Sequence, residues 1–152
     1  MAVTVRGPSS TGRGPVHNLA GTGDRGPCPA HGVPVPTIEL GARGERIAAA
    51  FLGDAGLRVL DRNWRCRDGE LDIVARDRDA LVFCEVKTRR GTGFGHPVEA
   101  VTPAKQRRLR LLAQRWLAAH DEHAPDLRFD VVGVLVPPSG PARVTHLRGA
   151  FS

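Results

Sequence analysis

Two neighbouring segments of the sequence place carboxylates and a lysine among apolar residues. Glu70 and Asp72 stand in the first segment, and Glu85 and Lys87 stand in the second. A carboxylate inside an apolar strand is costly unless a cation or a metal ion compensates its charge. These residues are therefore the first candidates for a site that carries out chemistry.

The spacing within each segment indicates that the charged side chains converge. Side chains alternate between the two faces of a strand, so Glu70 and Asp72 share one face, as do Glu85 and Lys87. A short polar turn at residues 77–79 joins the two segments and predicts a hairpin. The acids of both strands can therefore meet on one side of a sheet.

Two arrangements accommodate such a group of acids: a buried salt bridge with lysine, or a bound divalent cation. The cation is favoured because acids outnumber lysines in this part of the chain. The acids are Glu45, Glu70, Asp72 and Glu85, and the lysines are Lys87 and Lys105. Carboxylates held together without a cation would need raised pKa values. Ligands that are all oxygen atoms suit Mg²⁺ or Mn²⁺.

A cation bound by carboxylates suits the hydrolysis of phosphodiesters. Such an ion lowers the pKa of a bound water and neutralises a phosphoryl oxygen. An ammonium two residues beyond Glu85 can position the attacking water or offset charge in the transition state. The chain has 22 basic side chains, of which only Lys87 and Lys105 are lysine. Arginine does not replace a compact ammonium in a tight site, so both lysines are candidates for such a role.

The elements that would position these residues follow from the apolar periodicity. A helix is expected at residues 42–55, with Glu45 at the inward edge of its apolar stripe. Thr102 and Pro103 are typical of a helix start, and Lys105 extends the buried face of that helix. Strands are expected at residues 57–64, 70–76, 80–88 and 129–136, with a glycine-rich loop at 91–97 and a short edge strand at 142–148. The order α-β-β-β-α-β predicts an α/β (α+β) fold, a mixed central sheet flanked by helices.

Length and composition favour one domain behind a leader. Residues 1–38 are rich in Gly and Pro and lack apolar periodicity, which predicts a disordered segment; residues 39–152 are expected to form the domain. No apolar run approaches the roughly 18 residues of a membrane helix, and no signal-peptide pattern is present, so a cytoplasmic protein without membrane contact is expected. The three cysteines are widely spaced, which argues against a disulfide framework or a zinc site.

The formal net charge of +6 favours an anionic partner, nucleic acid above all. Arg62, Arg65, Arg89 and Arg90 could contact a phosphate backbone, with a merely solvated arginine surface as an equal alternative. Trp64 could stack on a base, although packing against the core is the favoured interpretation.

The ordered set of motifs resembles the core of PD-(D/E)XK nucleases. More narrowly, the chain is similar to the small bacterial YraN-like family, related in fold to restriction endonucleases and archaeal Holliday-junction resolvases. The motifs are residues 69–74 and 83–89, Gly44-Glu45, residues 62–65, Lys105 and residues 128–130. The resemblance spans about residues 41–136, and it implies a restriction-endonuclease-like αβββαβ core for the domain.

The resemblance also implies roles for individual residues. Asp72 and Glu85 would be the principal metal ligands, with the Val86 carbonyl as a third. Lys87 would be the catalytic lysine. Glu45 would complete the metal site through water, and Lys105 would reach the scissile phosphate.

Two acids are left without an assigned role. Glu70 replaces the proline of the superfamily's name, and its role stays open. Asp130 either pairs with Arg128 or a neighbouring strand, or contributes to the site.

Two functions follow from the motifs and the resemblance. The first is a Mg²⁺- or Mn²⁺-dependent endonuclease that hydrolyses DNA phosphodiesters, with branched or repair intermediates as candidate substrates. The second is a non-catalytic nucleic-acid-binding protein with the nuclease fold, acting in recombination, repair or DNA uptake. The intact set of Asp72, Glu85 and Lys87 favours the enzyme, because a protein that only binds has no need of it. Resolvase-like enzymes often act as homodimers, so a dimer is a further expectation.

Overall fold

The computed structural model describes residues 2–4, 37–91 and 101–151. In chain order the elements are β1 (Ala2–Thr4), α1 (Thr37–Asp54), β2 (Arg58–Cys66), β3 (Gly69–Asp77), β4 (Ala80–Arg90), α2 (Pro103–Ala119), β5 (Asp126–Val136) and β6 (Arg143–Phe151). From α1 to β5 the order is α-β-β-β-α-β, which confirms the predicted mixed fold. No helix in these ranges is both long and apolar enough to cross a membrane.

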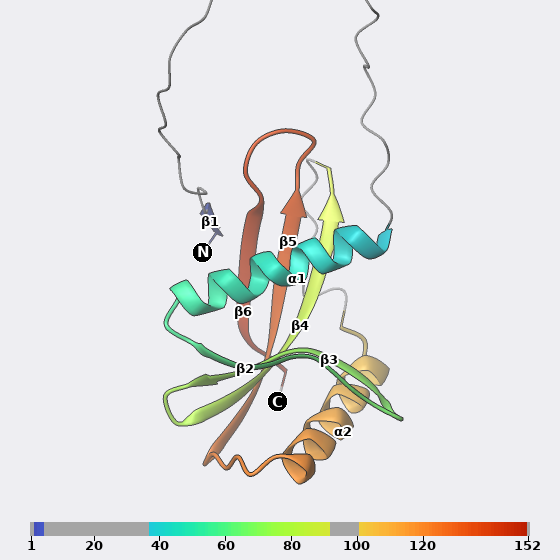
Figure 1. Ribbon diagram of the computed structural model, residues 1–152, viewed down its shortest axis with the longest axis vertical. Coiled ribbons are helices and arrows are strands. Elements are labelled where there is room, and N and C mark those ends of the chain that lie inside the picture. The colour runs from blue at the N-terminus through green and yellow to red at the C-terminus, as the bar shows by residue number, and fades with distance from the viewer. Residues whose placement is uncertain (1, 5–36, 92–100, 152) are drawn as a thin grey trace, which may run out of the picture.

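The strands form a single sheet in the order β1-β6-β5-β4-β3-β2 (Figure 1). Strands β4 and β5 are parallel, and every other neighbouring pair is antiparallel. A parallel pair needs a crossover connection, and α2 lies in the segment that connects β4 to β5. The sheet is therefore mixed because of this one helical crossover.

The two helices cover opposite faces of the sheet. Ala48 and Leu52 of α1 belong to one buried cluster, which includes Cys84 of β4. Trp116 of α2 belongs to a second cluster, which includes Phe83, the residue next to Cys84. Alternation of side chains along β4 thus separates two hydrophobic cores, each closed by one helix.

Three details differ from the sequence-based expectation. Helix α1 begins at Thr37, about five residues before the predicted start at residue 42 and inside the predicted leader. The expected short edge strand at 142–148 is wrong in length and position: β6 has nine residues and lies between β5 and β1. Ala2–Thr4 pairs antiparallel with β6 through Val3 and Val144.

Other expectations of the sequence fall largely on residues that the structure does not describe. Residues 5–36 of the predicted leader and 92–97 of the predicted loop lie outside the described ranges. The division into a disordered leader and a domain at residue 38 therefore stays a prediction.

The sheet opens between β3 and β4. Their register runs from Asp77↔Ala80 to Ile73↔Cys84 and ends there. Strand β3 continues to pair with β2 as far as Gly69, and β4 continues to pair with β5 as far as Arg90. The far end of the β2–β3 hairpin therefore leaves β4 and turns toward α2 (Figure 1). This opening is where the predicted acids meet.

Candidate functional site

Asp72 stands at the point where β3 leaves β4. In a continued ladder the N–H of Val86 would donate to a backbone carbonyl of β3. Instead, Val86 N donates to Asp72 Oδ2 at 2.8 Å. The aspartate side chain thus takes the place of a backbone acceptor, which fixes its carboxylate at the opening of the sheet.

Glu85 is a buried carboxylate that two lysines approach. Only 4% of the surface of Glu85 is exposed to solvent. Glu85 Oε1 lies 2.9 Å from Lys87 Nζ and 3.0 Å from Lys105 Nζ. The first lysine comes from β4, the strand of Glu85 itself, and the second from α2, the next element of the chain, so both elements compensate one buried charge.

Burial and neighbouring acids raise the pKa of Asp72 from 3.8 to about 7. Burial is the largest cause, followed by the negative charge of Glu85; the charge of Glu45 adds to the rise, while the Val86 N–H and Lys105 oppose it. At neutral pH this carboxyl is therefore near the midpoint of its titration. Its ionised form lacks sufficient positive charge nearby, a deficit that a bound cation would remove.

Helix α1 brings Glu45 toward this site by close packing against β4. A Cβ atom on Gly44 would overlap Thr88 Oγ1 and would lie 2.7 Å from Thr88 Cβ. Only glycine therefore allows α1 to approach β4 this closely, next to Lys87. The adjacent Glu45 is partly buried and acts on the pKa of Asp72 through its charge.

The donor atoms suit a small hard cation that is bound partly through water. Among the described residues, no group of three or more His, Cys, Asp or Glu side chains is close enough to form a metal cage. The site offers two carboxylates, Asp72 and Glu85. The Val86 carbonyl faces the same opening as its N–H, because both groups of a strand residue point to one side. Mg²⁺ commonly uses one or two carboxylates together with waters and substrate phosphates, so these residues fit such an ion.

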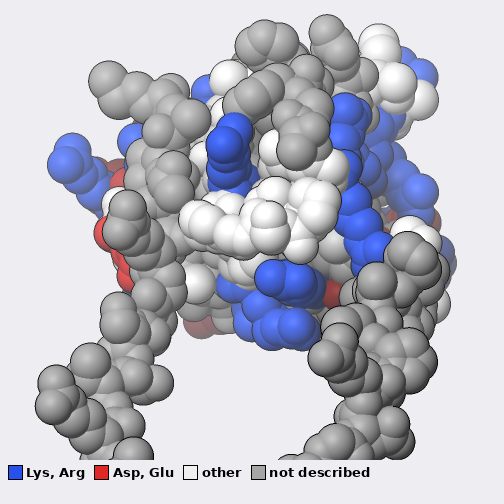
Figure 2. Space-filling view, turned by 90° about the horizontal axis from the view of Figure 1, so that it is seen from above, with Lys and Arg blue, Asp and Glu red and all other residues white. Residues whose placement is uncertain are grey.

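A groove of about 490 Å³ leads away from Asp72 between the β2–β3 hairpin and α2. It is lined by residues of both walls: Arg65, Cys66, Gly69, Glu70, Asp72, Lys105 and Arg108. Of the four arginines that the sequence suggested for phosphate contact, Arg65 lines this groove, and Arg62, Arg89 and Arg90 do not. Arg89 and Arg90 are exposed at the end of β4. Figure 2 views the end of the sheet where β4 terminates, and lysine and arginine dominate the charged surface visible there.

Arg108 is a groove residue that the sequence-based reasoning missed. It follows Lys105 by three positions on α2, and residues with this spacing are neighbours on a helix surface. That spacing was the available signal, because Lys105 was already a candidate. Glu70, whose role was open, forms an ion pair with Arg65, with 2.7 Å between Arg65 Nε and Glu70 Oε2.

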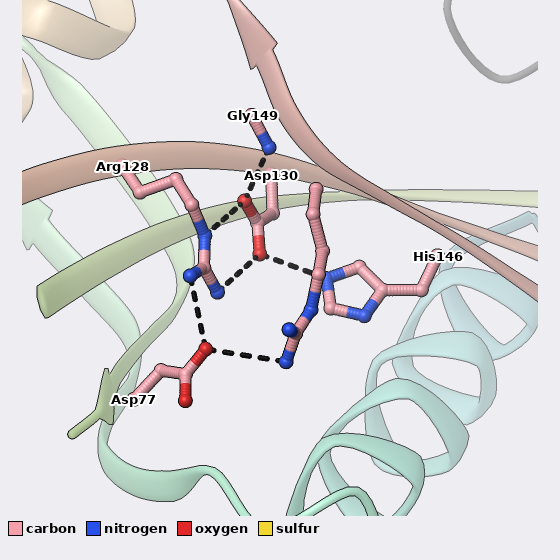
Figure 3. A network of polar contacts seen from close by, with 6 residues as sticks. Asp77, Arg128, Asp130, His146 and Gly149 are labelled. Carbon is pink, nitrogen blue, oxygen red and sulfur yellow. Dashed lines mark hydrogen bonds and ion pairs between the residues drawn. The ribbon is translucent and has the colours of Figure 1, made fainter.

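Asp130 belongs to a separate buried network on β5 and β6 (Figure 3). Arg128 donates to it at 2.9 and 3.1 Å, His146 Nε2 lies at 2.8 Å, and Gly149 N donates at 2.9 Å. Burial alone would raise the pKa of Asp130, but these bonds hold it below the ordinary value. Arg128 also pairs with Asp77 at 2.9 Å. The geometry thus corresponds to the pairing alternative of the sequence analysis.

A register irregularity explains the orientation of Asp130. The pairing of β5 with β6 shifts between Phe129 and Val131, the two residues that flank it. Bulges of this kind redirect a side chain and are common next to active sites.

Trp64 could stack on a base or pack against the core, according to its sequence. In the structure it is partly buried against the second hydrophobic cluster, and its ring centroid lies 6.2 Å from that of His120.

Fold and site together define a mixed α+β protein with two carboxylates and two lysines at the opening of its sheet. Residues 44–134 match the model of the uncharacterised protein family UPF0102, and the chain belongs to this family. The UPF0102 protein of Beutenbergia cavernae is 62% identical over 110 residues, which cover 72% of this chain and 93% of the relative. That of Frankia alni is 59% identical over 112 residues, covering 74% and 93%. That of Streptomyces griseus is 59% identical over 111 residues, covering 72% and 93%.

Proposed function

We propose that the protein is a metal-dependent nuclease of the PD-(D/E)XK type that hydrolyses DNA phosphodiesters. The observation that carries this proposal is the meeting of Asp72, Glu85, Lys87 and Lys105 at the opening between β3 and β4. Branched DNA and repair intermediates are the proposed substrates. Since a four-way junction has two symmetric scissile phosphates, a homodimer is part of the proposal for such substrates.

Asp72 and Glu85, with the Val86 carbonyl, would hold Mg²⁺ or Mn²⁺. When bound, the ion lowers the pKa of a water ligand and neutralises a phosphoryl oxygen. Asp72 is oriented for this role by the Val86 N–H at 2.8 Å. Glu45, whose charge already acts on Asp72, would hold a water molecule of the ion's outer shell.

Lys87 would position the attacking water and offset negative charge in the transition state. Its ammonium lies 2.9 Å from Glu85 Oε1, so it is held beside a proposed metal ligand. A preorganised donor of this kind contributes roughly 100-fold or more to a rate. The side chain is about one-third exposed, which leaves it accessible to substrate.

Lys105 would bind a non-bridging oxygen of the scissile phosphate. Its ammonium lies 3.0 Å from the same Glu85 oxygen, and its side chain lines the groove that leads to Asp72. A strand that enters by this groove would therefore meet Lys105 next to the proposed metal ligands. Release of Lys105 from Glu85 would supply the phosphate contact when the ion takes over the compensation of that carboxylate.

The test is a cleavage assay with linear, nicked and four-way-junction DNA in Mg²⁺, Mn²⁺ or chelator. We expect cleavage with either metal for the wild type and a loss of roughly 100-fold or more for Asp72→Asn and Lys87→Ala. Asp79→Asn, in the exposed turn between β3 and β4, is the matched control and should cleave normally. Binding by all of these proteins without any cleavage would refute the enzyme and favour the non-catalytic alternative.

A further inference from the structure

The groove beside Asp72 has a cationic side chain on each of its two walls. Arg65 comes from β2, and Arg108 comes from α2. Lys105 lies in the same lining, toward Glu85. Among the contacts of the described residues, neither arginine touches the proposed metal ligands: Arg65 pairs with Glu70, and Arg108 donates to the Asp68 carbonyl.

Arg108 is held in the groove by the turn between β2 and β3. Its Nε donates to the Asp68 carbonyl at 3.3 Å. Its guanidinium lies against the backbone of Gly69, where a Cβ atom would be 2.5 Å from Arg108 Nη2 and 2.9 Å from Nε. A side chain at position 69 would therefore displace the Arg108 guanidinium from this place. The Nε of this exposed arginine is thus used in a hydrogen bond with the turn, and its terminal nitrogens can donate to a ligand in the groove.

Arg65 is held on the opposite wall by its partner across the hairpin. Arg65 and Glu70 are register partners of β2 and β3, and their ion pair of 2.7 Å orients the guanidinium. A guanidinium has five N–H donors, so one ion pair does not exhaust it. Glu70 is accordingly a positioning residue for Arg65, which accounts for an acid in this groove.

We infer that Arg65 and Arg108 form a second anion subsite that binds the backbone phosphate adjacent to the scissile one. This inference rests on the proposed function, since it names a further part of the same substrate. Guanidinium groups bind phosphate oxygens in a planar, directed geometry, and two of them on facing walls suit one strand of the DNA that passes between them. The subsite therefore serves strand positioning rather than recognition of a base sequence.

The first test measures DNA binding as a function of salt, in Ca²⁺ to prevent cleavage. A labelled duplex is titrated with the wild type, Arg108→Ala and the control Arg107→Ala. Arg107 is an exposed neighbour on the same helix and is not in the groove lining. The binding constant K falls as salt rises, and loss of one duplex phosphate contact reduces the magnitude of this negative slope of log K against log salt by about 0.9. We expect this decrease for Arg108→Ala and no change for Arg107→Ala.

The second test neutralises the phosphate itself. After the cut position on an oligonucleotide has been mapped, methylphosphonate replaces the phosphate on either side of it. One of these substitutions should weaken wild-type binding roughly tenfold, as expected for loss of a charge-assisted hydrogen bond. The same substitution should have no further effect on Arg108→Ala, because that variant has already lost the contact.

The possible failures are distinguishable. If the wild type binds and cleaves DNA but Arg107→Ala and Arg108→Ala behave alike, the subsite is refuted and the proposed function stands. An equal methylphosphonate effect in wild type and Arg108→Ala would also overturn the subsite. If the wild type neither binds nor cleaves DNA, the proposed function fails and the subsite fails with it.

Discussion

Replacing Asp72 with asparagine should stabilise the protein when no metal is bound. The carboxylate is largely buried and is repelled by Glu85 and Glu45. An asparagine retains an oxygen that can accept the 2.8 Å hydrogen bond from Val86 N, but it carries no charge. The substitution therefore removes the electrostatic cost and retains the local structure. Such a gain is typical of residues placed for function rather than for stability.

The magnitude follows from the raised pKa. The pKa of Asp72 rises from 3.8 to about 7, and each unit corresponds to about 1.36 kcal/mol, so the upper limit is about 4 kcal/mol. Solvent screening of a side chain that is not fully buried lowers the expected gain to roughly 2 kcal/mol. Between these pKa values the folded state binds more protons than the unfolded state, so the free energy of unfolding of the wild type falls as pH rises. The variant should lack this decline.

The assay is urea unfolding in chelator at several pH values from 4 to 8. The gain of Asp72→Asn should be smallest at about pH 4, where the wild-type carboxyl is protonated in the folded state and only partly protonated in the unfolded state, and largest above pH 7. Asp79→Asn, exposed in the β3–β4 turn, should show no such trend. Saturating Mg²⁺ should stabilise the wild type and leave Asp72→Asn nearly unchanged, because binding to the folded state alone raises the free energy of unfolding.

Two results would contradict the reasoning. If Asp72→Asn were no more stable than the wild type at pH 8, the buried carboxylate would not be short of positive charge. If the gain were independent of pH between 4 and 8, it would arise from packing rather than from ionisation. Either outcome would also weaken the assignment of Asp72 as a metal ligand.

Three further predictions concern the surroundings of the site. Gly44→Ala should lower the free energy of unfolding by about 1–3 kcal/mol, because its Cβ would overlap Thr88, and Thr88→Ala should recover part of the loss in urea titrations. Asp130→Ala should lower the free energy of unfolding by about 3 kcal/mol or more, because it leaves Arg128 and His146 without their buried partner. DNA cleavage below the melting temperature of this variant should persist. A folded Asp130→Ala protein that does not cleave would contradict a structural role. Lys87→Arg should fold normally by circular dichroism but lose DNA cleavage, because a planar guanidinium does not replace the ammonium beside Glu85; near-normal cleavage would oppose the catalytic role.

Sequence periodicity predicted the main elements of the fold and the convergence of the acids. Alternation puts Glu70 and Asp72 on one face of their strand and Glu85 and Lys87 on one face of theirs, since strand side chains repeat every two residues. The apolar stripe of α2 predicted that Lys105 extends its buried face, and the structure brings this lysine to Glu85 at 3.0 Å. Local rules thus determine which residues share a face of one element.

The remaining features depend on how the elements meet. The register of β3 with β4 ends at Ile73↔Cys84, and this end makes Asp72 an acceptor for Val86 N instead of one more residue in a ladder. The length of β6 and its inner position depend on pairing with both β5 and β1. Such long-range pairings leave little trace in local sequence, because they depend on partners far away in the chain.

By itself, the sequence determined the order of the elements from α1 to β6 and the types of charged side chain on each strand of the β3–β4 hairpin. Only the tertiary structure decided that two lysines share one oxygen of Glu85, that Glu70 holds Arg65, and that Arg108 lies against Gly69. The physical reason is that periodicity specifies a direction relative to one helix or strand. A contact between elements requires their packing, which here depends on a sheet that opens at Asp72 and on a helix that closes over the opening.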